Sequence, residues 1–229
     1  MNIQAASPST FAPRRRFRYG AVLPCMVLFA ASLYGSKPFA QTPPPAASHT
    51  TFVFFADHSL REEQWTSLFA ALHRGKTVLA TSTPALSGEV DMMRSDQVQP
   101  GMRVDSAIIV YLHGDCTLLP RPRFVVMGAL GWVPRVRGRI QPFIHVDCAR
   151  IVDMLGPQAL GMNHDRRDTV MAEAVAHVIL HEWVHYSTQS AAHSGHGVSK
   201  SVFGVADLLA DDAPQNPHRR SIFRNRGSL

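Results

Sequence analysis

A chain of 229 residues in which 45% are hydrophobic is long enough to fold around its own core, which argues against a disordered protein. The formal net charge of +6 would suit a nucleic-acid-binding protein if the basic residues formed a patch on the folded domain. Five of the 23 basic residues lie in residues 1–40, which contain no acid, so 18 remain against 17 acidic residues. Because the rest of the chain is nearly neutral, we expect no nucleic-acid partner.

Residues 1–40 have the pattern of a signal peptide. The arginines at positions 14–16 and 18 precede an apolar run, residues 19–35, that is shorter than the roughly 20 residues needed to span a bilayer. We therefore expect cleavage near Ala40, a secreted or periplasmic protein, and no membrane attachment after cleavage. A retained membrane anchor is the alternative. Arg14 and Arg15 also faintly resemble a twin-arginine export signal.

The remaining chain divides by composition into three parts. Residues 41–50 form a proline-rich linker, residues 51–212 a single domain, and residues 213–229 a basic tail that we expect to be flexible. Four segments with apolar, β-branched or aromatic residues are predicted strands: 51–56, 105–113, 124–133 and 141–147. Three segments with helical spacing are predicted helices: 60–73, 148–155 and 203–210.

Local signals predict where these elements begin and end. Ser59 is the expected N-cap of the first helix, and Gly75 is expected just beyond its end. Residues 81–103 are rich in Ser, Pro and Gly and are predicted to be an irregular loop. The apolar run in 105–113 predicts a central strand, and a turn is expected at residues 137–139.

The longest predicted helix covers residues 168–189, with Asp168 as its N-cap. Apolar residues occupy most of its circumference, which predicts a buried helix. An unpaired imidazole or carboxylate inside such a helix would cost several kcal/mol, so its polar side chains need partners.

This helix carries the H-E-x-x-H pattern at His181, Glu182 and His185. Residues four apart lie on one helix face about 6 Å from each other, so both imidazoles can bind one Zn²⁺. Zinc lowers the pKa of a bound water molecule to roughly 7. Glu182, about 100° around the helix from His181, is the expected general base that accepts the proton from this water.

A catalytic zinc ion needs a third protein ligand, for which several residues are candidates. The small, polar segment after the helix predicts that the chain turns back, which favours His193 and then His196 as that ligand. Asp207 and Asp211 are more distant options. His177 lies about 12 Å along the helix axis from His185, too far to share an ion with it. We therefore interpret it as a residue that packs the helix or that supports the metal ligands without binding the ion.

Two cysteines, Cys116 and Cys148, lie in the predicted domain. In an exported protein such a pair most often forms a disulfide. Both follow a histidine by three residues, at His113 and His145, so a second, structural zinc site is the alternative.

The motif at 181–185, followed by His193 and by Gly197-Val198, resembles a group of short secreted bacterial zinc peptidase-like proteins related to metzincins. The resemblance covers about residues 105–210. It implies an α+β, zincin-like fold in which a mixed β-sheet packs on a long active-site helix. It also implies a peptidase acting on peptides or proteins, with His193 as the third ligand.

The alternative is a secreted, non-catalytic zinc-binding protein with a structural metal site, in which His196 could be a fourth ligand. Oligomeric state is not predicted.

Overall fold

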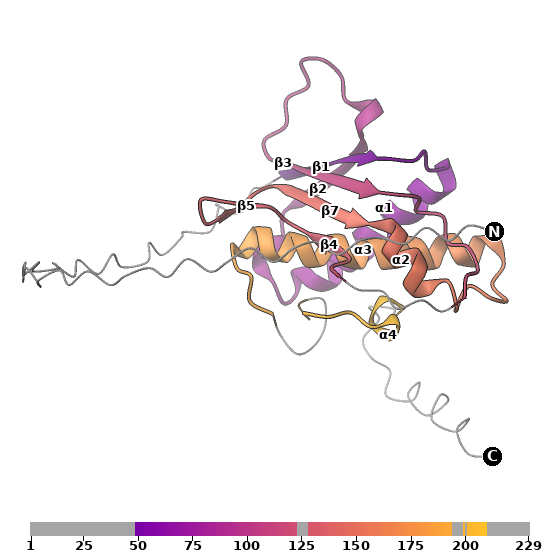
Figure 1. The fold of residues 1–229 in the computed structure, drawn as a ribbon. Helices are drawn as coiled ribbons and strands as arrows, with labels where there is room; N and C mark the ends of the chain where they lie inside the picture. The colour runs from indigo at the N-terminus through magenta and orange to yellow at the C-terminus, as the bar shows by residue number, and fades with distance from the viewer. Residues whose placement is uncertain (1–48, 123–127, 194–198, 200, 210–229) are drawn as a thin grey trace, which may run out of the picture. The chain divides into compact units, whose positions relative to one another are not determined.

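The computed structural model describes residues 49–122, 128–193, 199 and 201–209, all of which belong to the unit Ala40–Leu229 (Figure 1). The predicted signal peptide, nearly all of the linker and the basic tail lie outside these described residues. Among the helices that the described ranges contain, none is both long and apolar enough to cross a membrane.

A mixed sheet of five strands forms one layer of the fold. Its order is β2-β1-β3-β7-β4, in which only β4 runs antiparallel to its neighbour. The prediction that 105–113 forms a central strand is confirmed, because β3 is the third of the five strands. The strands are β1 His49–Ala56, β2 Glu89–Arg94, β3 Ala107–His113, β4 Gly131–Trp132 and β7 Phe143–Asp147.

Two long helices pack against one face of this sheet and form the second layer (Figure 1). They are α1 Glu62–Ala80 and α3 His164–Thr188. On β1, the alternate residues Phe52 and Phe54 point to the helices: Phe52 meets Trp183 of α3 edge-on, and Phe54 meets Trp65 of α1. The expected mixed α+β architecture, with a sheet packed on a long helix, is therefore observed.

The prediction of an irregular loop over 81–103 is wrong. This segment contains β2 together with two short 3₁₀ helices, η1 Pro84–Leu86 and η2 Ser95–Gln97. Strand β2 is an edge strand that pairs only with β1, and exposed Glu89 and Asp91 alternate with half-buried Val90 and Met92. An edge strand with one solvated face carries few apolar residues, so the strand signal was weak against the surrounding turn residues.

Helix α1 extends further than its capping signals predicted. Its N-cap is Arg61 instead of Ser59, and it runs through Gly75 to Ala80. Gly75 is buried within the helix and is not among the glycines with positive φ, so it does not act as a left-handed C-cap. A glycine inside a helix costs only about 1 kcal/mol, which the packing of α1 on α3 offsets.

Helix α3 begins four residues before the predicted start. Asn163 is its N-cap, and the side-chain oxygen accepts a hydrogen bond of 2.9 Å from the amide of Arg166. Asp168, the N-cap predicted from sequence, lies inside the helix and is buried. Its carboxylate accepts a 2.6 Å hydrogen bond from Arg61, which joins the start of α1 to α3.

The segment between β3 and β7 contains shorter elements than expected. Of the predicted strand 124–133, residues 124–127 lie outside the described residues, and the strand itself is only Gly131–Trp132. A hairpin follows, with the predicted turn at Arg137 and Gly138, whose φ angles are 49° and 83°. Its strands are β5 Arg135–Val136 and β6 Arg139–Ile140.

Two short helices complete the described chain. Helix α2, Cys148–Leu155, agrees with its predicted bounds, and the side chain of Asp147 caps it by accepting from the amide of Arg150. Helix α4, Val205–Leu208, is shorter than the predicted helix 203–210.

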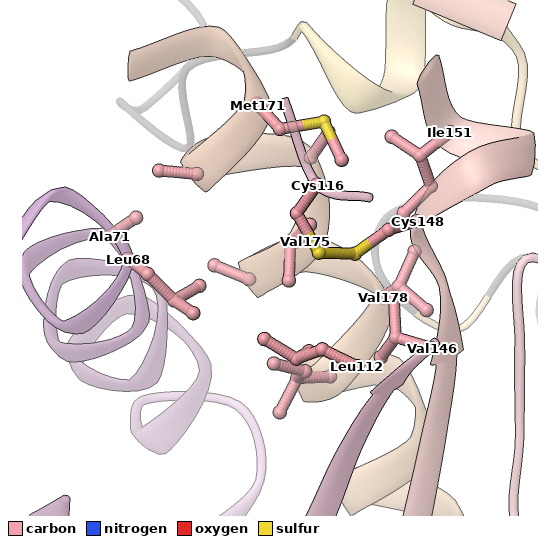
Figure 2. Close-up of a cluster of buried hydrophobic side chains, with 14 of the residues drawn as sticks. Leu68, Ala71, Leu112, Cys116, Val146, Cys148, Ile151, Met171, Val175 and Val178 are labelled. Atoms are coloured by element: carbon pink, nitrogen blue, oxygen red, sulfur yellow. A yellow bond between two sulfur atoms is a disulfide. The ribbon is translucent and has the colours of Figure 1, made fainter. Parts of the chain in front are cut away.

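Cys116 and Cys148 form a disulfide, with a Cα–Cα distance of 4.8 Å. Figure 2 shows this bond inside the core, where side chains of α3, among them Met171 and Val175, surround it. The bond ties the segment after β3 to the first residue of α2. Because both thiols are consumed by the disulfide, the alternative of a second zinc site with two cysteine ligands is not observed.

Candidate metal centre

The histidines of the H-E-x-x-H motif lie on the buried part of α3, one turn apart. His181 is 6% exposed and His185 is 7% exposed, and their Nε2 atoms are 2.9 Å from each other. The two rings are nearly perpendicular, with an interplanar angle of 88°. Both nitrogen atoms therefore point toward a common position beside the helix, as the i, i+4 spacing predicted.

The end of α3 turns the chain back toward this position. Gln189 adopts a left-handed conformation with a φ of 52°, and the amide of Ser190 donates to the carbonyl of His185. The next turn closes where the amide of Ala192 donates to the Ser190 hydroxyl. This return places the Nε2 atom of the exposed His193 at 3.2 Å from that of His185.

Of the predicted third ligands, His193 is the one that the described structure brings to the pair. His196 and Asp211 lie outside the described residues. The carboxylate of Asp207 instead accepts a hydrogen bond from the amide of Gly204. His177 is not part of the group that could hold a metal ion, and its buried ring meets Phe203 edge-on.

His181, His185 and His193 are close enough together to hold a metal ion. Their three ligand nitrogens lie within 4.8 Å of one another, and they form the one such group in the part of the chain that the structure describes. Three nitrogens bound to a tetrahedral zinc ion at 2.0–2.1 Å would lie about 3.3 Å apart. Two of the three separations, 2.9 and 3.2 Å, are close to this value, and the whole group lies within 4.8 Å.

A backbone contact sets the tautomer of His185. Its Nδ1 atom is 2.6 Å from the carbonyl oxygen of Ser190, which can only accept a hydrogen bond, so Nδ1 carries the proton. The lone pair of neutral His185 is then on Nε2, the atom that faces the other two histidines. Metal-bound histidines in proteins are typically held in this way.

Glu182 is buried beside the three histidines, with 5% of its surface exposed. Burial raises the pKa of its carboxyl group to about 7, which makes the carboxylate a stronger base than an exposed one. Its Oε1 atom is 3.9 Å from Nε2 of His181, which is beyond hydrogen-bond distance. The carboxylate therefore lies beside the nitrogen atoms that could bind a metal ion.

Strand β4 approaches α3 closely at Glu182. A Cβ atom on Gly131 would overlap the side chain of Val178, and would lie 3.0 Å from the carbonyl oxygen of His145 and 3.3 Å from Cγ of Glu182. Only glycine fits between the strand and the helix at this point. The outer edge of β4 is also an edge of the sheet.

A cleft of about 340 Å³ opens at the three histidines, within the size range of ligand-binding sites. Its walls come from β4, from the hairpin β5–β6, from α3 and from the segment after α3. Phe203 packs edge-on against the ring of His181.

The sequence did not predict a role at the site for four residues: Gly131, Arg135, Ser190 and Phe203. The arginine-rich segment 137–139 is the sequence feature nearest to these residues, and it predicted only a turn.

Comparison of the chain with models of protein families, with curated proteins and with solved structures found no match. The functional assignment therefore depends on the geometry of the site.

Proposed function

We propose that this protein is an exported zinc-dependent peptidase with a zincin-like fold. The observation that carries the proposal is the convergence of three imidazole nitrogens on one position, with the buried carboxylate of Glu182 beside them. A long helix carrying H-E-x-x-H, packed under a mixed sheet whose antiparallel edge strand borders the cleft, supports the zincin-like assignment.

Zinc is the proposed metal because three imidazoles beside an open cleft match its preference for nitrogen ligands and would leave one position for water. Calcium and magnesium are disfavoured, since they prefer oxygen ligands. The hydrogen bond from His185 to the Ser190 carbonyl supports the same assignment, because it orients Nε2 toward the ion. We propose His181, His185 and His193 as the zinc ligands.

A zinc ion held by His181, His185 and His193 would supply an acidified water molecule and would polarise the scissile carbonyl. Glu182 accepts the proton of the attacking water and returns it to the leaving amine. Glu182 follows His181 directly on α3, so its carboxylate faces the cleft beside His181. In this proposal it is not a zinc ligand.

The substrate is proposed to be an extended peptide segment lying along β4. This strand ends the sheet, so its outer backbone groups can pair with an added strand. Gly131 lies directly beside Glu182, so a peptide paired with β4 would pass the carboxylate. The arrangement favours cleavage within flexible or unfolded segments of peptides and proteins.

The test is Glu182→Gln, which keeps the shape of the side chain but removes its ability to accept a proton. We expect the variant to bind one zinc ion per chain and to lose about 10²- to 10⁴-fold in kcat on a peptide library. Metal content by mass spectrometry and cleavage by peptide profiling provide the two measurements.

Unchanged turnover in Glu182→Gln would remove Glu182 from the mechanism. Zinc bound by a wild-type protein that cleaves nothing in the library would instead favour the alternative, a non-catalytic zinc-binding protein. Val184→Ala is a matched control on the same helix, because Val184 is half-buried and does not line the cleft.

A further inference from the structure

The hairpin β5–β6 presents three exposed arginines at the border of the cleft: Arg135, Arg137 and Arg139. Only Arg135 lines the cleft itself. His181, Glu182 and His185 line the same cleft. The side chain of Arg135 therefore borders the cavity that contains the candidate metal centre.

The pairing of the hairpin explains why Arg135 differs from Arg139. Arg135 is opposite Ile140, and Val136 is opposite Arg139, so each pair shares one face of the hairpin. Ile140 is buried and lines the cleft, which places Arg135 on the cleft face. Val136 and Arg139 are exposed on the opposite face.

The end of α3 holds this hairpin in place. Gln189 accepts a 3.0 Å hydrogen bond from the amide of Ile140 and donates a 3.1 Å hydrogen bond to its carbonyl. It also donates to the carbonyl of Tyr186, within the last turn of α3. The strand that pairs with β5 is therefore attached to the helix that carries His185, so Arg135 is positioned relative to the metal centre.

Arg135 is one of the described arginines that have no acidic partner. Among the residues that the structure describes, no carboxylate forms an ion pair with Arg135. By contrast, five other arginines each contact an acidic side chain: Arg61, Arg74, Arg94, Arg121 and Arg150. An unpaired guanidinium in a ligand-sized cleft is suited to bind an anionic group of the ligand.

We propose that Arg135 is a specificity-determining residue that binds a carboxylate of the substrate. This inference rests on the proposed function and narrows its substrate class to peptides with a carboxylate near the cleavage site. Arg135 lies four residues after Gly131, which is at most about 13 Å along an extended chain. The carboxylate should therefore be within about four residues of the substrate residue that passes Glu182. It can come from an Asp or Glu side chain or from a free C-terminus.

The experiment measures binding separately from cleavage. Zinc-loaded Glu182→Gln protein is titrated with fluorescent peptide libraries that carry Glu, Gln or Lys at one fixed position. Further libraries have a free or an amidated C-terminus, which distinguishes the two sources of the carboxylate. We expect a carboxylate library to bind roughly 10- to 100-fold more tightly than its neutral counterpart.

Arg135→Gln in the same background should reduce this preference to less than about threefold, and Arg135→Glu should make the Lys library the tighter binder. Arg139→Gln is the matched control, since it removes the same charge from the opposite face of the hairpin and should keep the preference. Equal affinity for carboxylate and neutral libraries would overturn the proposal. An equal loss in both arginine variants would also overturn it, because it would indicate only a general effect of surface charge.

Cleavage of the same libraries by the wild-type chain separates this inference from the proposed function. Carboxylate binding that depends on Arg135, without any cleavage, would support the Arg135 site and contradict the peptidase. Cleavage with no dependence on Arg135 would support the peptidase and contradict the site.

Discussion

Two pairs of histidines in this protein have the same nitrogen-to-nitrogen distance but different surroundings. His181 and His185 approach to 2.9 Å on the buried face of α3, and His113 and His145 approach to 2.9 Å on the opposite face of the sheet. The helix pair has perpendicular rings, whereas the sheet pair is nearly coplanar at 7°. The distance between two imidazoles therefore does not by itself identify a metal site.

In the sheet pair, the coplanar rings direct the two nitrogens at each other, which is the geometry of a hydrogen bond. The other ring nitrogen of His113 faces the carboxylate of Asp57 at 3.4 Å. Tyr111 and Trp132, on the strands at either side of His145, stack parallel to the rings. The described structure brings no third metal ligand to this pair.

In the helix pair, the two rings are perpendicular, and a third imidazole nitrogen approaches that of His185 to 3.2 Å. His193 supplies that third nitrogen, and the Ser190 carbonyl determines which nitrogen of His185 is free. The direction of the lone pairs and the presence of a third donor distinguish the two sites. Three predictions test the metal site and the contacts around it, beginning with the largest expected effect.

Replacing one histidine in each pair should separate the sites most strongly. His185→Ala removes a central ligand, so we expect zinc affinity to fall more than about 100-fold, beyond the effect typical of outer-shell partners. His145→Ala should retain one zinc ion per chain. Metal titration with a competing chelator measures both affinities, and equal losses in the two variants would contradict the assignment of the site to α3.

Removal of the disulfide should affect stability and leave the metal site intact. The bond joins residues 32 positions apart, so Cys116→Ala with Cys148→Ala should lower the free energy of unfolding by roughly 3–4 kcal/mol. Urea unfolding measures the loss. Wild-type protein with the disulfide reduced should still bind one zinc ion. A second bound ion would show that the freed thiols and the sheet histidines can form the alternative site.

The contact of β4 with α3 should give the smallest of the three effects. Gly131→Ala introduces a methyl group next to Val178 and Glu182, which we expect to cost about 1–3 kcal/mol and to lower kcat. Gly204→Ala is the control, because its added Cβ would be 3.5 Å from the nearest atom. Thermal unfolding and peptide cleavage are the measurements, and full activity in Gly131→Ala would show that the close approach is dispensable.

The elements predicted well from sequence are those whose signals are local. Helix α2 agrees with its predicted bounds because Asp147 before it and Gly156 after it mark its ends. The central strand β3 was predicted because its residues alternate between buried and half-buried positions, so that neither face is fully solvated. Such a strand carries a continuous run of apolar residues. Edge strand β2 was missed because it needs apolar residues on one face only.

Helix boundaries failed where contacts between distant residues outweighed local preference. Asp168 has the side chain of an N-cap, but it lies inside the helix and its hydrogen-bond donor at 2.6 Å is Arg61, more than 100 positions earlier in the chain. Gly75 resembles a helix end, yet α1 continues through it because the helix packs along α3. These partners cannot be identified from local sequence patterns.

By itself the sequence determined the part of the site that lies within one helix. The spacing of His181 and His185 is set by the 3.6-residue period of α3, and that period is a local property of the backbone. The tertiary structure decided how other segments complete the site: His193 after the left-handed turn, Gly131 against Glu182, and Arg135 on the cleft face of its hairpin. Their positions depend on packing and hydrogen bonds between segments far apart in the chain, which no local pattern encodes.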